Sequence, residues 1–267
     1  MHIGVTLRNM GPQSSTAVLV QAALAVEAAG FESLWITDHI AIPPDDSEGS
    51  NGRYLDPLVT LAYVAGATRN VRLGTGVLIL PYRPALPTAK QVATLQELSG
   101  DRLLLGVGIG WMDSEFRALG IDRHQRGRIS DDTLEFLNRC FENDSVEAND
   151  QPFLFRPRPE KPPILIGGAA PHALVRAAKF GSGWLPMGLE PDQLEAPMKR
   201  YSELCAAQGK TPGGVTLMRG LPVDDPPRCL DIRDSYRDLG VERLVCAVRY
   251  DTAEEYSAAM EKLRILL

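Results

Sequence analysis

Short apolar segments of the β type alternate with helical segments along the whole chain of 267 residues. Eight segments have the character of buried strands. They span Ile3 to Leu7, Ser33 to Thr37, Val71 to Leu80, Arg102 to Val107, Ile164 to Ile166, Gly183 to Pro186, Val215 to Gly220 and Arg243 to Ala247. A candidate helix follows each strand, and several begin with proline in the first turn or stop at glycine. These helices span Thr16 to Ala29, Pro57 to Ala67, Pro87 to Leu98, Thr133 to Phe141, His172 to Lys179, Pro191 to Ala207, Cys229 to Asp238 and Thr252 to Leu263.

Eight strand and helix units in a chain of this length match the usual size of a (β/α)8 barrel. We therefore predict an α/β protein with a (β/α)8 TIM barrel, formed as a single domain by residues 1–267. A doubly wound open sheet is the alternative. That fold more often shows a GxGxxG turn after its first strand, and Asn9, Gly11 and Pro12 give no such fingerprint.

Two loops are unusually long, one after the second strand and one in the region after the fourth. The first, Ile40 to Tyr54, is rich in Pro, Gly, Ser and Asp, and the second spans Asn143 to Pro163. Loops that follow barrel strands lie at the catalytic face, so we expect the first to act as a lid. The alternative is a disordered surface excursion.

Charge and composition limit the class of partner. The net charge is −6, and no window carries a cluster of Lys and Arg dense enough to follow a phosphate backbone. We expect no nucleic-acid partner and instead a small-molecule substrate. No run approaches the 18 apolar residues that a membrane span needs, so we also expect no membrane partner.

The four cysteines are far apart and form no CxxC pair, which argues against a disulfide framework and against a zinc site. They are Cys140, Cys205, Cys229 and Cys246. Buried thiols in a reducing compartment are the simplest interpretation. Because no secretory signal precedes the first strand, we expect a cytoplasmic location.

A glycine-spaced turn ends the fourth predicted strand, in the sequence RLLLGVGIGWMDSEF. Gly106, Gly108 and Gly110 remove side chains where the strand stops, so that a planar ring or a phosphate could approach the backbone closely. The alternative is a tight turn between strand and helix.

Two further glycine turns fall at predicted strand ends. Gly74 and Gly76 interrupt the third strand, a pattern expected where a bulge or a strained peptide supports a ligand, with a plain edge bulge as the alternative. Gly167 and Gly168, followed by Ala169, precede a helix, and their free amides could hold a phosphate.

Asp38 and His39 come directly after the second strand, which in a barrel brings both side chains to the catalytic mouth. His39 can act there as acid, base or hydrogen-bond donor, and Asp38 can hold its tautomer or bind a hydroxyl group. Alternatively, Asp38 caps the next turn and His39 packs beside it. The other histidines are isolated and show no HxH or HExxH spacing, so we predict no metal site.

Aromatic and basic side chains near the strand ends are candidates for substrate binding. Trp111, Trp184 and Tyr82 could wall an apolar pocket, or pack at the barrel rim. Arg83 could meet an anionic ligand or bridge to a surface carboxylate.

Taken together, these segments resemble the luciferase-like monooxygenase family, including its deazaflavin-dependent oxidoreductases. The resemblance runs along the whole chain, through LWITDH, LGTGVLILPYRPALPTAKQVATLQELSGDRLLLGVGIGW, WMDSEFRALG and PPILIGGAAPHALVRAAKFGSGWLP. It implies a barrel that binds FMN or coenzyme F420 at the strand C-termini, above a non-proline cis peptide at Gly76-Val77. It also implies a phosphate on Gly167 to Ala169 and places His39 at the reactive edge of the ring. The cofactor-binding residues expected on this basis are Asp38, Thr75, Gly76, Val77, Gly108, Ile109, Gly110, Gly167, Gly168 and Ala169.

The chain departs from familiar members of this family at three places. Ile109 stands where bacterial luciferases have an arginine that grips the flavin phosphate. Trp111 stands where deazaflavin-dependent sugar-phosphate dehydrogenases have a glutamate acid, and Ile42 and Pro43 replace a loop tryptophan. These differences argue against both specific activities.

The resulting hypothesis is an oxidoreductase that transfers a hydride between reduced coenzyme F420 and a small organic substrate, with His39 as catalytic residue. A monooxygenase that uses reduced FMN and oxygen is the close alternative, with His39 assisting by proton transfer. A non-catalytic flavin-binding protein is a rival of another class, which would have no need of His39. The resemblance further implies a homodimer, and a separate reductase could supply the reduced cofactor.

Overall fold

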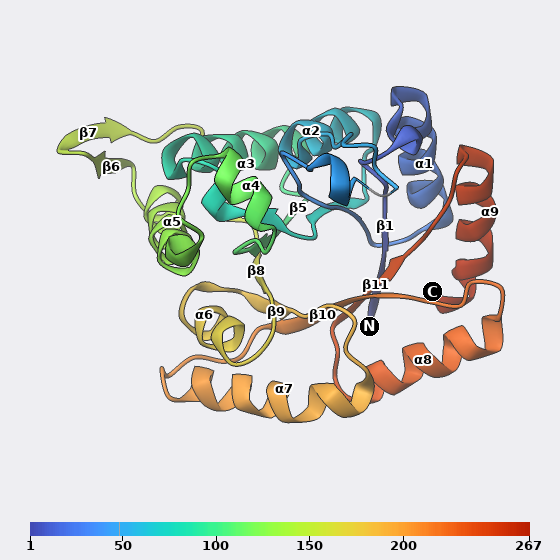
Figure 1. Ribbon diagram of the computed structural model, residues 1–267. Coiled ribbons are helices and arrows are strands. Elements are labelled where there is room, and N and C mark those ends of the chain that lie inside the picture. Colours follow the sequence, from blue (N-terminus) through green and yellow to red (C-terminus); the bar gives the residue numbers. More distant parts are fainter. Residues whose placement is uncertain (48) are drawn as a thin grey trace.

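Nine parallel strands in the described part of the chain close into a barrel of eight strand positions (Figure 1), because the short strands β3 and β4 both pair with β5 and share one position. The computed structural model describes residues 1–47 and 49–267. The pairing order is β3, β2, β1, β11, β10, β9, β8, β5 and β4, and a further pairing of β3 with β5 closes the ring. The barrel strands are β1 (His2–Thr6), β2 (Ser33–Ile36), β3 (Arg72–Thr75), β4 (Leu78–Ile79), β5 (Leu103–Gly108), β8 (Ile164–Gly167), β9 (Gly183–Leu185), β10 (Gly214–Gly220) and β11 (Arg243–Ala247). The predicted (β/α)8 barrel is thus confirmed.

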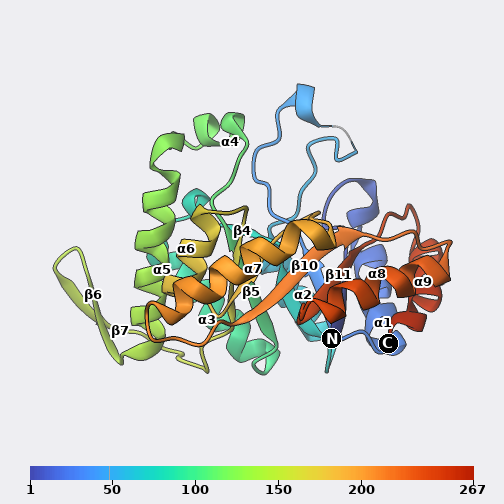
Figure 2. The same cartoon turned by 90° about the horizontal axis from the view of Figure 1, so that it is seen from below.

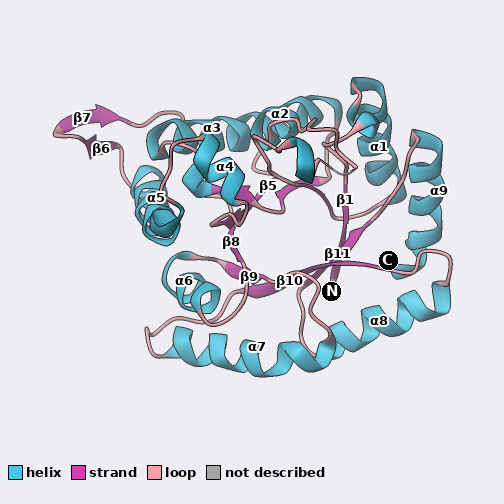
Figure 3. Ribbon diagram, in the orientation of Figure 1, coloured by secondary structure: helices cyan, strands magenta, loops and turns pink. Residues whose placement is uncertain are grey.

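Helices cover the outside of the barrel (Figure 3). They are α1 (Thr16–Ala29), α2 (Pro57–Ala67), α3 (Ala85–Ser99), α4 (Asp113–Ala118), α5 (Arg126–Glu142), α6 (His172–Phe180), α7 (Pro191–Ala206), α8 (Pro226–Asp238) and α9 (Ala253–Leu263). Every predicted helix has a counterpart. The largest shift is in α5, which begins at Arg126 rather than Thr133, and α4 is an additional short helix that the sequence interpretation left out.

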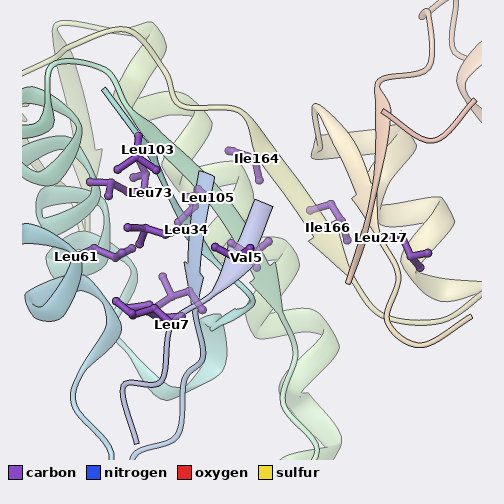
Figure 4. Packing of buried hydrophobic residues seen from close by; sticks show 14 of the residues in the cluster. Val5, Leu7, Leu34, Leu61, Leu73, Leu103, Leu105, Ile164, Ile166 and Leu217 are labelled. Atoms are coloured by element: carbon purple, nitrogen blue, oxygen red, sulfur yellow. The ribbon is translucent and has the colours of Figure 1, made fainter. Parts of the chain in front are cut away.

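Successive side chains of each strand point alternately to the helices outside the barrel and to the barrel interior. The two sets form two separate hydrophobic cores. Leu34, Leu73 and Ile166 belong to the larger one, which packs strands against helices (Figure 4). Trp35 belongs to the smaller one, together with Leu104, Leu165, Leu185, Met218 and Val245. A Cβ atom built on Gly74 would lie 2.3 Å from the Trp35 ring, so Gly74 leaves room for this indole rather than for a ligand.

The third predicted strand, Val71 to Leu80, is in fact two short strands. A non-proline cis peptide at Gly76-Val77 separates β3 from β4. This is the cis peptide that the family resemblance implied. The second long loop contains the antiparallel hairpin β6 (Ser145–Ala148) and β7 (Gln151–Leu154), which the sequence did not predict. Its turn residues Asn149 and Asp150 both have positive φ, as a tight hairpin turn requires.

The segment that follows β2 and the helix that follows β5 project from the same end of the barrel (Figure 2). They are residues 40–47 and 49–54, and α4. Glu48, within the expected lid, lies outside the described residues. In the described part of the chain, no helix is long and apolar enough to cross a membrane.

Gly106 allows two strand backbones to approach closely. A Cβ atom built on it would lie 2.0 Å from the backbone oxygen of Thr75, whose hydroxyl donates to the oxygen of Gly106 at 2.7 Å. We expect Gly106→Ala to lower the free energy of unfolding by about 2 kcal/mol or more. The new methyl group would clash with the backbone of Thr75, which cannot move aside as the end of a flexible side chain can. Gly127→Ala is the matched control, since its Cβ would meet only Arg176 Nη2 at an ordinary 3.6 Å. Urea unfolding of both variants checks this, and equal stability of the two would contradict it.

Candidate active site

A cavity of about 350 Å³ opens at the C-terminal ends of β2, β4, β5 and β8. Its lining is mostly apolar or glycine, with two ionisable side chains, Asp38 and His39. The lining residues are Thr37, Asp38, His39, Gly76, Val77, Ile79, Gly108, Ile109, Gly110, Trp111, Gly167, Gly168 and Met187. Most residues of the expected cofactor site therefore meet at one cavity. Such a lining suits a planar ligand with few polar groups.

The cis peptide Gly76-Val77 lies in the lining of this cavity. Glycines surround the Val77 side chain: a Cβ atom on Gly108 would lie 2.5 Å from its Cγ2 atom, and one on Gly167 would lie 2.7 Å from its Cγ1 atom. The spaced glycines thus serve first to seat Val77. Their absent side chains also leave the cavity open above that residue, because Gly108 and Gly167 both border it.

His39 is held at the rim of the cavity by a carboxylate from another element. Its Nδ1 atom lies 2.9 Å from Oε2 of Glu115, which belongs to α4. The imidazole also packs edge-on against the Tyr54 ring at 5.0 Å and the Trp111 ring at 6.0 Å. These contacts fix both the position and the plane of the imidazole.

Glu115 is fully buried and accepts four hydrogen bonds. Besides His39, its donors are the hydroxyl of Tyr82 at 2.8 Å and the backbone amides of Ile40 and Ala41. Burial by itself would raise the pKa of Glu115, but the hydrogen bonds from His39, the two amides and Tyr82 outweigh it and lower this pKa to about 2. Glu115 is therefore an ionised buried carboxylate that joins His39 to the start of the 40–54 segment.

Sequence interpretation missed Glu115 as a site residue. A glutamate in the first turn of a helix is usually solvated and interacts favourably with the helix dipole. The only available signal was its place, in the first turn of the helix that follows a strand ending at the barrel mouth.

Asp38 lines the cavity, but its carboxylate accepts hydrogen bonds from other groups of the protein. It accepts from Arg83 at 2.6 and 2.9 Å and from the amide of Ile79 at 2.8 Å. Burial raises the pKa of Asp38, and the paired guanidinium counters that effect. Arg83 also bonds Asp56 at 2.9 Å. Arg83 does not line this cavity and is engaged by two carboxylates, so its role in ligand binding stays a prediction that the contacts at this cavity do not support.

Tyr82 and Trp184 lie behind the site rather than in its wall, which corrects the expectation of an aromatic substrate pocket for both. Tyr82 is buried with its hydroxyl on Glu115, and burial followed by this hydrogen bond raises its pKa. Trp184 is fully buried, and its Nε1 donates to the backbone oxygen of Gly168 at 2.9 Å. Trp111 alone of the three lines the cavity, with 65% of its surface exposed.

The Gly167 to Ala169 turn leads into α6, and its residues from Gly168 onward are exposed. Gly168 has a φ of 118°, a conformation that favours glycine. Ala169 does not line the cavity but follows Gly168 directly. Thr75, also expected at the cofactor, is buried beneath the cavity with its hydroxyl on Gly106.

Metal-binding geometry is absent from the part of the chain that the structure describes: no group of three or more His, Cys, Asp or Glu side chains is placed to hold an ion. The four cysteines are buried and unpaired.

Comparison with known proteins connects this site to one family. The family model described as luciferase-like monooxygenase matches residues 1–223. An uncharacterized protein of Mycobacterium tuberculosis is 33% identical over 210 residues, which cover 72% of this chain and 73% of that protein. The F420-dependent hydroxymycolic acid dehydrogenase of the same organism is 31% identical over 199 residues, covering 68% of this chain and 52% of the dehydrogenase.

Solved structures share the fold at lower identity. The oxygenating constituent of 3,6-diketocamphane monooxygenase from Pseudomonas putida, a type II Baeyer-Villiger monooxygenase in complex with FMN, superposes with a TM-score of 0.79. It is 14% identical, and the match covers 99% of this chain and 96% of that one. A cofactor of either type, F420 or FMN, thus occurs among the proteins that this chain is similar to.

Proposed function

Because the chain belongs to the luciferase-like monooxygenase family, we propose that it is an oxidoreductase that transfers a hydride between coenzyme F420 and a small organic substrate. One observation carries the proposal: the cis peptide Gly76-Val77 lines an apolar cavity whose rim holds His39 on a buried carboxylate. The open space above Val77, which side chains at Gly108 and Gly167 would fill, fits a planar ring.

The residues that would hold the cofactor are those of the cavity lining and the neighbouring turn. Gly76, Val77 and Gly108 would lie beneath the ring, and the Gly167 to Ala169 turn would hold a phosphate through its amides. When bound, F420 supplies a carbon centre that gives or accepts a hydride. We favour F420 over FMN because Ile109 occupies the place of the luciferase arginine that grips the flavin phosphate, and because a relative 31% identical to this chain is F420-dependent.

His39 would move the proton that accompanies hydride transfer. Because Glu115 is ionised, the hydrogen bond between them places a proton on Nδ1 of His39. The other ring nitrogen, Nε2, is then the atom available to a ligand. In the neutral imidazole it accepts the proton of an alcohol that is being oxidised, and in the imidazolium it donates one to a carbonyl oxygen that is being reduced.

A monooxygenase that uses reduced FMN and oxygen is the second candidate. The likeness to an FMN-bound monooxygenase over nearly the whole chain favours it, and the same His39 would serve in proton transfer.

An anaerobic assay separates the two candidates. A panel of alcohols and carbonyl compounds is mixed with oxidised or reduced F420, and the cofactor absorbance is followed without oxygen. We expect turnover with at least one compound under these conditions. Oxygen consumption with reduced FMN, together with no anaerobic F420 turnover, would identify the monooxygenase instead.

A homodimer through the outer face of α2 is also part of this proposal. The helix contains no charged residue, and Val59 and Tyr63, one turn apart, are 66% and 52% exposed. A helix that is apolar on all sides is normally covered. We expect sedimentation to show a dimer for the native chain and a monomer for Tyr63→Glu. Val175→Glu, at an exposed apolar position on α6, is the control that should stay dimeric. A monomeric native chain would contradict the interface.

We propose a cytoplasmic location, which the four buried, unpaired cysteines support. A separate reductase would then supply the reduced cofactor.

A further inference from the structure

A second cavity, of about 460 Å³, occupies the other half of the barrel mouth, at the ends of β1, β10 and β11. Its lining residues are Thr6, Leu7, Arg8, Met10, Thr37, Met187, Gly188, Met218, Arg219 and Ala247. Thr37 and Met187 line both cavities, so the two adjoin. Met218 connects them at depth, because a Cβ atom on Gly76 would lie 2.4 Å from its terminal methyl group. A molecule in the second cavity therefore lies next to a ligand held over Gly76-Val77.

The walls of this second cavity are apolar and deformable. The apolar side chains of its lining are Leu7, Ala247 and three methionines, Met10, Met187 and Met218. Methionine side chains are flexible and polarisable, and they adapt to apolar groups of irregular shape. The cavity thus favours ligands with a large apolar part and can adapt to apolar parts of different shape.

Arg8 contributes a guanidinium cation that makes only some of the hydrogen bonds its N–H groups could donate. Its Nη1 atom donates to the backbone oxygen of Tyr250 at 2.9 Å, while Nη2 reaches Gly49 only at 3.5 Å. The Nε atom is buried and has no hydrogen-bond partner among the described residues. The carboxylate that Arg8 meets within the described chain is Asp251, at 3.9 Å and with a side chain 77% exposed, which makes a weak ion pair.

Arg219, the other guanidinium of the cavity, differs from Arg8. It pairs with Glu190 at 2.8 Å and with the hydroxyl of Tyr236. Its charge is therefore balanced within the protein, which leaves Arg8 as the cation available to a ligand.

We propose that the second cavity is the substrate subsite and that it selects molecules with an apolar body and a terminal carboxylate, which binds Arg8. This inference rests on the proposed function, because it places the substrate beside a cofactor in the first cavity. The carboxylates of the F420 tail share this chemistry, so the test must separate the two sources of the anion.

Calorimetric titration with octanoate and with octanol tests the proposal, using the protein with and without added cofactor. We expect octanoate to bind at least about tenfold more tightly than octanol. Arg8→Gln should abolish this preference and leave octanol binding unchanged, whereas Arg8→Lys should keep part of it. Arg237→Gln, which removes an exposed arginine of α8, is the control and should bind as the native chain does.

Equal affinity for octanoate and octanol, or a preference that survives in Arg8→Gln, would overturn the proposal. Loss of cofactor affinity in Arg8→Gln would also overturn it, since the anion would then belong to the cofactor. Failure of the proposed function looks different: the native chain would show no affinity for F420, whatever its affinity for octanoate.

Discussion

Replacement of His39 by alanine is expected to lower kcat/KM by about a hundredfold to ten-thousandfold while leaving cofactor affinity close to that of the native chain. His39 lines the cavity, and its position is fixed by Glu115 and Tyr54, which do not line the cavity, and by Trp111, which does. Its removal therefore takes away the proton-transfer group without disturbing the floor at Gly76-Val77. The measurement is anaerobic F420 turnover with the best substrate of the panel, alongside a cofactor titration.

His124→Ala is the matched control, because that histidine is exposed in a short turn before α5. Unchanged turnover in His39→Ala would remove His39 from the mechanism. A native chain that binds cofactor but turns over no compound with any electron acceptor would instead indicate a flavin-binding protein.

Glu115→Gln is expected to reduce kcat/KM by roughly a hundredfold, because an amide no longer forces the proton of His39 onto Nδ1. It should also lower the free energy of unfolding at neutral pH by about 3 kcal/mol, the equivalent of a pKa displaced from 4.5 to about 2. A carboxylate with a depressed pKa stabilises the fold fully above its unfolded pKa. That contribution is lost as the pH falls from about 4.5 to about 2.

Urea unfolding at pH 7 and at pH 3 checks the stability part of this prediction. The difference between native chain and Glu115→Gln should be large at pH 7 and shrink at pH 3. Glu261→Gln, at an exposed glutamate of α9, should follow the native chain at both values. If the free energy of unfolding changed with pH in the same way in the native chain and in Glu115→Gln, the charge of Glu115 would not stabilise the fold.

The sequence was sufficient to predict the barrel, and most of the residues predicted for the cofactor line one cavity at its mouth. Alternating strands and helices reveal the fold directly, because each strand of a parallel barrel reads as a short apolar run. The glycines at 76, 108 and 167 all line that cavity, although two of them primarily make room for Val77.

Long-range side-chain pairing is what the sequence could not reveal. Glu115 is separated from His39 by 76 positions, and Arg83 from Asp38 by 45, so neither pair has a local signature. Trp184 likewise resembled a residue at a pocket wall because it falls near the end of a predicted strand, and its contact with Gly168 depends on the closed barrel. Composition alone cannot separate a polar group that binds a ligand from one that supports its neighbour.

Titration of the cofactor-free protein with F420 and, separately, with FMN tests the central claim most directly. We expect F420 to quench protein fluorescence in a saturable way and to bind more tightly than FMN. Tight FMN binding with no measurable affinity for F420 would contradict the cofactor assignment. Binding of neither would contradict the cofactor site at Gly76-Val77 itself.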